Sequence, residues 1–253
     1  MYGDGQKFPA AIPDEFAMRS CLNLLFLAAL FIVPAHPAWA DEIGPAIKDV
    51  PIFDAHVHYK EPAWQPYPVG TVIKMMDRSG VAMALVSSTP DEGTIKLWEF
   101  APSRIVPELR PYHGNAGSSN WTKTEGMLDY IKQRLAKYPH EGIGEFHAHT
   151  LDASDRPLLR AVAGMSEPAF VAGSMLDRYQ TLYADTSYRE MDILEGDGSI
   201  DPAWMKVILR HSDRLMVGSD TWVNGQWASY EELIALNRQW LSRLPRAVAE
   251  RIA

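Results

Sequence analysis

Two histidines in the sequence have a spacing that suits metal binding. His56 and His58 lie at the end of the apolar stretch Val50–Val57, which is predicted to be a strand. Side chains at positions i, i+2 and i+4 of a strand share one face, so Asp54, His56 and His58 are predicted to point together. Two imidazoles at the C-terminal end of a strand can bind one divalent ion. The alternative is a pair of partly exposed histidines without a ligand.

Two carboxylates stand in similar positions in later predicted strands. Glu145 and His147 share a face of the predicted strand Gly142–His147, and Asp220 directly follows the predicted strand Arg214–Ser219. Carboxylate and imidazole ligands both suit zinc. Asp220 can also accept a proton from a water molecule, which is the role of a general base. The alternatives are a loop cap for Glu145 and an N-cap or turn aspartate for Asp220.

Four further residues are candidates for contact with a substrate. Asp185 and Arg189 lie at or just beyond the end of the predicted strand Thr181–Ser187, although a structural ion pair explains them equally well. Trp222 follows Asp220 closely and can stack on a substrate or pack at the rim of the core. His147 is the fourth candidate, either as an additional ligand or as an auxiliary group.

Strands alternate with helices along the chain, and this order is typical of βαβ units with a parallel sheet. The predicted strands are Val50–Val57, Val81–Ser87, Arg104–Tyr112, Gly142–His147, Thr181–Ser187 and Arg214–Ser219. Helices are predicted over Val69–Ser79 and Asp91–Phe100, after a capping box at Thr122 and Glu125, after Asp201-Pro202, and after a second capping box at Ser229 and Glu232. The pattern predicts an α/β fold of the (β/α)₈ TIM-barrel type with about six βα units instead of eight.

The composition excludes some classes of protein. The chain has 253 residues and a formal net charge of −8, with no basic stripe, so it is not expected to bind nucleic acid. Its length suits one large domain. We expect the partner to be a small-molecule substrate, and the sequence leaves the oligomeric state open.

The N-terminal region has the features of a secretory signal. Met18-Arg19 supplies a positive charge, Leu22–Val33 is apolar, and Ala38-Trp39-Ala40 is a cleavage signal. Residues 1–17 are interpreted as a spurious upstream extension, 18–40 as the signal peptide and 41–253 as the mature domain. The apolar run is too short for a stable membrane anchor, although an uncleaved anchor or a buried helix is the alternative. The protein is therefore predicted to be periplasmic or secreted.

Three motifs together resemble the amidohydrolase superfamily, in particular its amidohydrolase-related branch. They are Phe53–His58, Gly142–Glu145 and Met216–Asp220, and the resemblance covers residues 50–253. It implies a (β/α)₈ barrel with one or two divalent ions, usually zinc, and a metal-activated water that attacks an amide, ester or lactone bond. It also implies that His56 and His58 are first-strand ligands and that Asp220 is the last-strand ligand and proton acceptor. Glu145 is implied to be a coordinating or bridging group.

The sequence departs from this family at two histidines that the family carries on strands five and six. After Thr150 the only histidine is His211, in a predicted helix. Leu158–Val162 resembles the helix after strand four, and Ala163–Pro168 resembles the loop after strand six, so the segment between them is predicted to be missing. Three hypotheses follow: a metal-dependent hydrolase, a decarboxylase of the same fold that acts on a small aromatic or unsaturated acid, and a non-catalytic remnant. The substrate is not specified.

Overall fold

The structure is a computed structural model that describes residues 47–147, 173 and 176–253. The predicted signal peptide, the residues before it and the predicted joint at 158–168 lie outside the described residues. Within the described part of the chain, no helix has the length and apolar character needed to cross a membrane.

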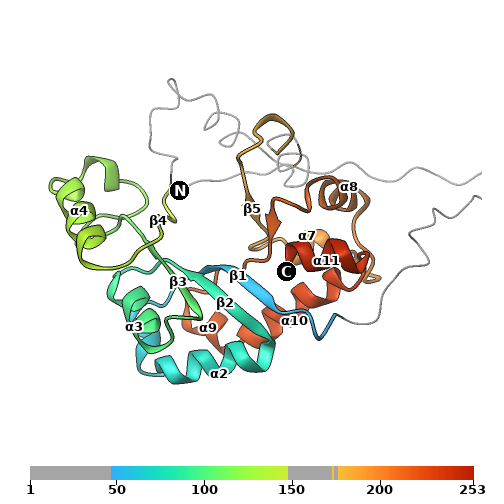
Figure 1. Cartoon of the computed structure of the whole chain (residues 1–253), viewed down its shortest axis with the longest axis horizontal. Helices are drawn as coiled ribbons and strands as arrows, with labels where there is room; N and C mark the ends of the chain where they lie inside the picture. Colours follow the sequence, from blue (N-terminus) through green and yellow to red (C-terminus); the bar gives the residue numbers. More distant parts are fainter. Residues whose placement is uncertain (1–46, 148–172, 174–175) are drawn as a thin grey trace, which may run out of the picture. The chain divides into compact units, whose positions relative to one another are not determined.

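The described elements alternate between strands and helices for most of the chain (Figure 1). The strands are β1 (Ile52–Val57), β2 (Val81–Val86), β3 (Ile105–Leu109), β4 (Gly142–Ile143), β5 (Ala184–Asp185) and β6 (Leu215–Met216). The helices are α1 (Glu61–Trp64), α2 (Val69–Ser79), α3 (Glu92–Phe100), the 3₁₀ helix η2 (Trp121–Lys123), α4 (Met127–Lys137), α7 (Glu190–Ile193), α8 (Pro202–His211), α9 (Asn224–Ala228), α10 (Tyr230–Leu241) and α11 (Arg246–Ile252).

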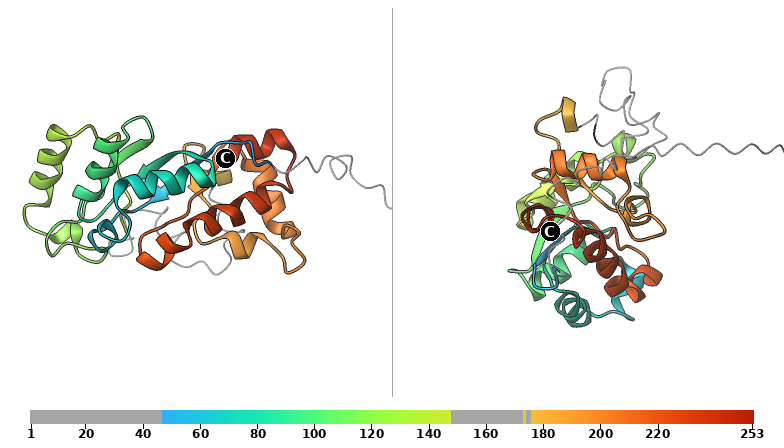
Figure 2. Two further views of the ribbon diagram at one scale, coloured as in Figure 1. Left: turned by 90° about the horizontal axis from the view of Figure 1, so that it is seen from below. Right: turned by 90° about the vertical axis from the view of Figure 1, so that its right-hand side faces the viewer.

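The strands form two parallel sheets that meet beside β1. One sheet has the order β1-β2-β3-β4 and the other pairs β5 with β6. Ala55 N donates to Val217 O at 2.9 Å and His58 N donates to Thr221 O at 2.8 Å, so β1 also runs alongside the β6 segment. The fold is therefore mixed α/β with a curled four-stranded parallel half-barrel, which is consistent with a partial α/β barrel (Figures 1 and 2).

Helix α2 has the bounds that the sequence predicts. Its buried residues Val72, Met75 and Met76 recur at helical spacing and face the core. The helix ends because Gly80 adopts φ 67°, a left-handed conformation in which its N–H bonds back to Asp77 O and Met76 O. Any side chain at Gly80 would also meet the Arg238 guanidinium, because a Cβ there would lie 2.5 Å from Nη2. Strand β2 therefore starts at the next residue.

Three helix starts were predicted from capping residues, and two of them lack the predicted side-chain cap. The start of α8 is confirmed, because the Asp201 carboxylate accepts a hydrogen bond from Trp204 N at 2.9 Å. Helix α10 begins after Ser229 as predicted, but the Ser229 side chain makes no capping bond. The capping box at Thr122 and Glu125 is wrong, because α4 begins after Gly126, which adopts φ 77°. Glycine takes this conformation without steric cost, so no side-chain cap is needed to turn the chain.

All six strands are shorter than predicted, and the last three are much shorter. Strands β4, β5 and β6 have two residues each: β4 and β6 stop before Glu145 and Asp220, and β5 ends at Asp185. Glu145 and Asp220 therefore lie on irregular backbone beyond the paired residues of their strands. This frees their side chains from the strict alternation of a strand.

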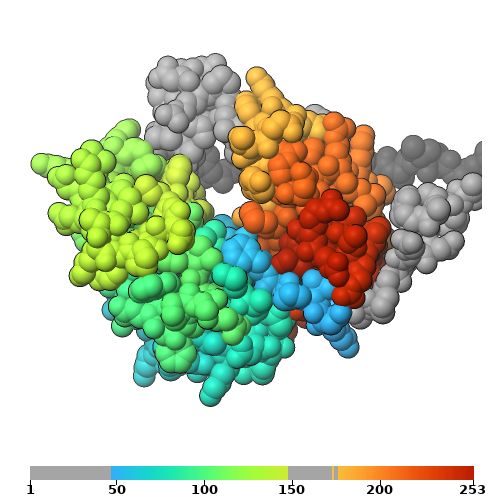
Figure 3. Space-filling view, in the orientation of Figure 1, coloured from blue at the N-terminus to red at the C-terminus, as the bar shows by residue number. Residues whose placement is uncertain are grey.

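The main core lies between the strands and the helices that surround them. Its largest fully buried side chains include Trp240, Ile234 and Ile208, from helices α10 and α8. Arg238 on α10 donates to the carbonyl oxygens of Ile47, Val50, Ser79 and Gly80, which ties this helix to the chain before β1 and to the end of α2. In the space-filling view the blue β1 segment is visible between the green and the red parts of the chain (Figure 3).

Candidate metal centre and adjoining cavity

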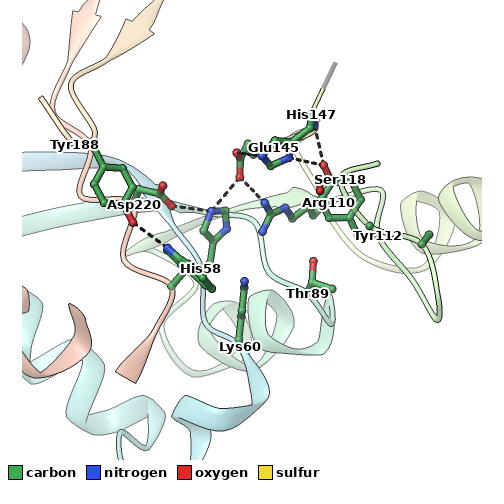
Figure 4. Close-up of a pocket in the computed structure, with 13 residues that line it drawn as sticks. His58, Lys60, Thr89, Arg110, Tyr112, Ser118, Glu145, His147, Tyr188 and Asp220 are labelled. Carbon is green, nitrogen blue, oxygen red and sulfur yellow. Dashed lines mark hydrogen bonds and ion pairs between the residues drawn. The ribbon is translucent and has the colours of Figure 1, made fainter. Parts of the chain in front are cut away.

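His58 presents one nitrogen atom to two carboxylates. Its Nδ1 donates a hydrogen bond to Ser87 O, the carbonyl that follows β2, so Nδ1 carries the proton in this arrangement. The lone pair is therefore on Nε2, which lies 3.2 Å from Glu145 Oε2 and 3.1 Å from Asp220 Oδ1 (Figure 4). Only 2% of the side chain is exposed. A neutral imidazole with a fixed tautomer is suited to metal binding.

His56 faces the same two carboxylates. Its Nε2 is 3.5 Å from Glu145 Oε2 and 3.6 Å from Asp220 Oδ1, and this buried nitrogen has no hydrogen-bond partner among the described residues. Its Nδ1 lies 3.3 Å from Ser187 Oγ and 3.4 Å from Asp185 Oδ2. A buried imidazole nitrogen without a partner is unusual in a folded protein and calls for an explanation.

The donor atoms of His56, His58 and Asp220 all lie within 4.8 Å of one another, and this group can hold a metal ion. Three protein ligands that leave a position open for water are typical of a catalytic zinc site. Glu145 lies beside both histidines, but its Oε2 also accepts a hydrogen bond from Arg110 Nη2 at 2.6 Å. The structure thus brings together all four residues that the sequence predicts as metal ligands, with Glu145 shared between the histidines and Arg110.

The electrostatics of this group favour a cation. Burial lowers the pKa of His56, but the neighbouring carboxylates of Asp185, Glu145 and Asp220 outweigh burial and raise the pKa to about 10. Burial raises the pKa of Glu145, whereas the two neighbouring imidazoles and the charge of Arg110 lower it well below its usual range. The carboxylates that stabilise a proton on His56 also attract a metal ion to the same place.

Asp54 does not point into the site, contrary to the prediction from strand alternation. The pairing of β1 with β2 changes register between Asp54 and Val57, and this irregularity breaks the alternation. The fully buried Asp54 carboxylate instead accepts hydrogen bonds from Ser219 N at 2.9 Å and from Tyr230 Oη at 3.0 Å. It holds the strand that carries the histidines against the turn that carries Asp220.

Asp220 itself lies in an unusual backbone conformation. Its φ of 43° is in the left-handed region, which aspartate tolerates better than most residues. Strand β6 has already ended at Met216, and Ser219 Oγ accepts hydrogen bonds from the N–H and hydroxyl of Thr221. This tight turn directs the Asp220 carboxylate toward the histidines instead of along the strand.

His56, His58 and Asp220, which could hold a metal ion together, and the adjacent Glu145 are called the metal group below. A cavity of about 510 Å³ adjoins this group (Figure 4). Its charged and ring-bearing lining residues are His58, Lys60, Arg110, Tyr112, Glu145, His147, Tyr188, Asp220 and Trp222. Lys60 Nζ lies 4.1 Å from the centre of the Trp222 ring. Burial and then the charge of Arg110 lower the pKa of Lys60. The metal group therefore opens onto a space that cations and aromatic rings surround.

The four predicted auxiliary residues have different surroundings. His147 and Trp222 line the cavity: His147 Nδ1 lies 2.7 Å from Tyr112 Oη, and Trp222 Nε1 donates to Tyr188 Oη at 2.9 Å. Asp185 lies behind the metal group, against His56 Nδ1. Arg189 is not among the cavity residues and pairs with Asp192 at 2.8 Å. Of the four, Arg189 alone makes no contact with the site in the described structure.

Three residues of the site were not predicted from the sequence. Arg110 and Tyr112 follow β3, and Lys60 follows β1, so all three lie just beyond the C-terminal end of a strand. In parallel α/β folds this is where binding residues gather, and the rule that selected Asp220 also applies to them. They lack the repeated spacing that made the histidines conspicuous.

Comparison of the sequence with protein-family models and with curated proteins, and of the structure with solved structures, gives no significant match. The functional argument therefore rests on the residues of the site.

Proposed function

We propose that this chain is a metal-dependent hydrolase of the amidohydrolase type, acting on an amide, ester or lactone bond of a small molecule. His56, His58 and Asp220 would hold the divalent ion, and Glu145 would complete or bridge the site. Zinc suits this donor set, because imidazole and carboxylate are both common zinc ligands.

One observation carries the proposal. The buried Nε2 of His56 has no hydrogen-bond partner among the described residues, and it faces the same carboxylate oxygens as the lone pair of His58. Two buried imidazole nitrogens beside two carboxylates are costly unless a proton or a cation lies between them. A divalent ion would supply that charge, and these nitrogen and oxygen atoms could all serve as its ligands.

The residues around the ion have separate tasks in the proposed reaction. A bound divalent ion would lower the pKa of a water molecule and polarise the bond to be cleaved. Asp220 lies within 3.1 Å of His58 and has a second carboxylate oxygen that can accept a proton. Arg110 keeps Glu145 ionised and in place through their 2.6 Å hydrogen bond. The substrate would occupy the cavity beside Trp222 and Tyr188.

We also propose that the fold is a (β/α)₈ barrel from which strands five and six are missing. The half-barrel order β1 to β4, the parallel β5–β6 pair and the contact of β1 with the β6 segment support this reading. The predicted joint lies in the connection between β4 and β5. A determined structure in which residues 148–172 form two further strands of the barrel would contradict it.

Export is a separate proposal that rests on the sequence of residues 18–40. We propose that the mature protein begins at Asp41 and works in the periplasm or outside the cell. N-terminal sequencing of the exported protein checks this, and an intact Met1 or Met18 in that protein would count against it.

The hydrolase proposal is tested with a panel of esters, lactones and amides and the zinc-loaded protein. We expect hydrolysis by the wild type and a loss of about 100-fold or more in Asp220→Asn, since a general base contributes roughly that much. Asp213→Asn is the matched control, because Asp213 lies on the same segment with 64% of its side chain exposed.

Three results would contradict the hydrolase proposal. The first is the absence of hydrolysis by zinc-loaded wild type, and the second is full activity in Asp220→Asn. The third is release of carbon dioxide from aromatic or unsaturated acids without hydrolysis of any panel member, which would identify a decarboxylase.

A further inference from the structure

The cavity beside the metal group contains two cations with different surroundings. Arg110 is paired with Glu145, but its Nε is buried and has no hydrogen-bond partner among the described residues. Only 8% of the Arg110 side chain is exposed. Arg110 therefore lines the cavity and has one buried donor that remains unpaired among the described residues.

Lys60 has no carboxylate within ion-pair distance in the described part of the chain. Its ammonium group lies instead over the Trp222 ring, 4.1 Å from the ring centre. Figure 4 shows the Lys60 side chain pointing toward the group formed by His58, Glu145 and Arg110. An ammonium group that lines a cavity without a carboxylate partner is free to bind an anionic ligand.

The balance of charge in the cavity supports the same conclusion. The lining carboxylates are Glu145 and Asp220, and the fixed cations are Lys60 and Arg110. If the proposed divalent ion is bound, it balances the two carboxylates and the two cations remain in excess. An anion that enters the cavity reduces this excess and is attracted by both cations.

The rest of the cavity wall suits a flat ring. Trp222 and Tyr188 are joined by the 2.9 Å hydrogen bond from the indole, and Gln226 Nε2 also donates to Tyr188 Oη at 2.7 Å. These bonds fix the orientation of two partly exposed rings beside Lys60. Tyr112 adds a third ring, over which the Arg110 guanidinium lies.

We propose that the substrate is a small aromatic anion whose charged group is bound by Lys60, with Arg110 beside it, and whose ring packs against Trp222. This inference rests on the proposed metal-dependent function, because the ion sets the excess of positive charge. Lys60 is then the residue that selects charged over neutral substrates.

Isothermal titration of the zinc-loaded protein with benzoate, benzamide and acetate tests the proposal. We expect benzoate to bind more tightly than both other probes. We expect Lys60→Met to weaken benzoate binding about tenfold or more, because a hydrogen bond to a charged group is worth roughly that much. Lys60→Arg keeps the charge and should restore most of the affinity, and benzamide should not distinguish the variants.

Lys96→Met is the matched control, because Lys96 lies over another indole, 4.8 Å from the centre of the Trp64 ring, and does not line the cavity. It should bind benzoate as the wild type does. The melting temperature of each variant shows whether the protein is folded.

The proposal is overturned if wild type does not bind benzoate, or if folded Lys60→Met binds it as tightly as wild type. If acetate binds as tightly as benzoate, the ring contributes nothing, and the claim that the substrate is aromatic is rejected. Metal content, measured on the same samples, distinguishes a failure of the anion site from a failure of the hydrolase proposal. Stoichiometric metal without Lys60-dependent binding rejects only the anion site, whereas Lys60-dependent binding in protein that takes up no metal rejects only the hydrolase.

Discussion

Hydrogen bonds behind the metal group decide which nitrogen atoms of its histidines face the ligand. Ser87 O fixes the tautomer of His58, and Asp185 and Ser187 lie against Nδ1 of His56. Such outer partners orient metal-binding histidines and raise their basicity. The sequence left Asp185 as either a substrate contact or a member of a structural ion pair, and the structure places it against Nδ1 of His56.

Asp185→Asn should therefore weaken zinc binding by about 10- to 100-fold, the usual effect of removing a partner behind a metal-binding histidine. Competition with a chromogenic chelator measures the affinity. Asp177→Asn is the control, because Asp177 Oδ1 also pairs with a histidine, His211, at 3.0 Å, but outside the site. Equal zinc affinity in Asp185→Asn and wild type would show that Asp185 has no supporting role.

At the scale of elements, local signals predicted the helices better than the strands. Helix α2 agrees with its prediction because its apolar spacing and its terminal glycine act within the helix itself. Strand β4 was predicted to reach His147 but stops at Ile143, because Glu145 turns toward His58 and Arg110. Contacts of that kind depend on neighbouring strands, which a single sequence does not reveal.

The caps of α8 and α10 give a matched pair of substitutions. Asp201→Ala should reduce the free energy of unfolding by about 1 kcal/mol, because it removes the bond to Trp204 N. Ser229→Ala should have less effect, since its side chain makes no capping bond. Urea unfolding measures both, and equal losses in the two variants would mean that the cap of α8 does not act through this bond.

At the scale of the whole molecule, the site depends on contacts between segments far apart in the sequence. Asp54 on β1 binds Ser219 beside β6 and Tyr230 on α10, and Glu190 on α7 accepts from Asn237 Nδ2 on α10 at 3.1 Å. The histidines and Asp220 could be predicted because each lies near or beyond the C-terminal end of a recognisable strand. The polar partners that hold these strands together follow no motif, so only the folded arrangement identifies them.

Glu190 gives a pH prediction for the stability of this arrangement. Burial raises the pKa of Glu190 above its ordinary value of 4.5. The unfolded protein then ionises first, so the stability of wild type should fall as the pH rises from about 4.5 through the raised pKa. Glu190→Gln keeps the acceptor for Asn237 and should lose this part of the pH dependence.

Urea unfolding between pH 4 and 8, in ~1-unit steps, measures the difference in stability between Glu190→Gln and wild type. The variant should gain in relative stability as the pH rises. Glu99→Gln, at an exposed position of α3, is the control and should show no such trend. A difference between Glu190→Gln and wild type that stays constant with pH would contradict the prediction.

The central claim is that His56, His58 and Asp220 form a metal site, and metal analysis of the purified protein tests it most directly. The account predicts about one divalent ion per chain in wild type, as a site with three protein ligands requires. It predicts loss of that ion in the folded double variant His56→Ala/His58→Ala and its retention in His113→Ala, whose ring stacks on Tyr130 outside the site. Wild type without stoichiometric metal, or a double variant that keeps as much as wild type, would contradict the account.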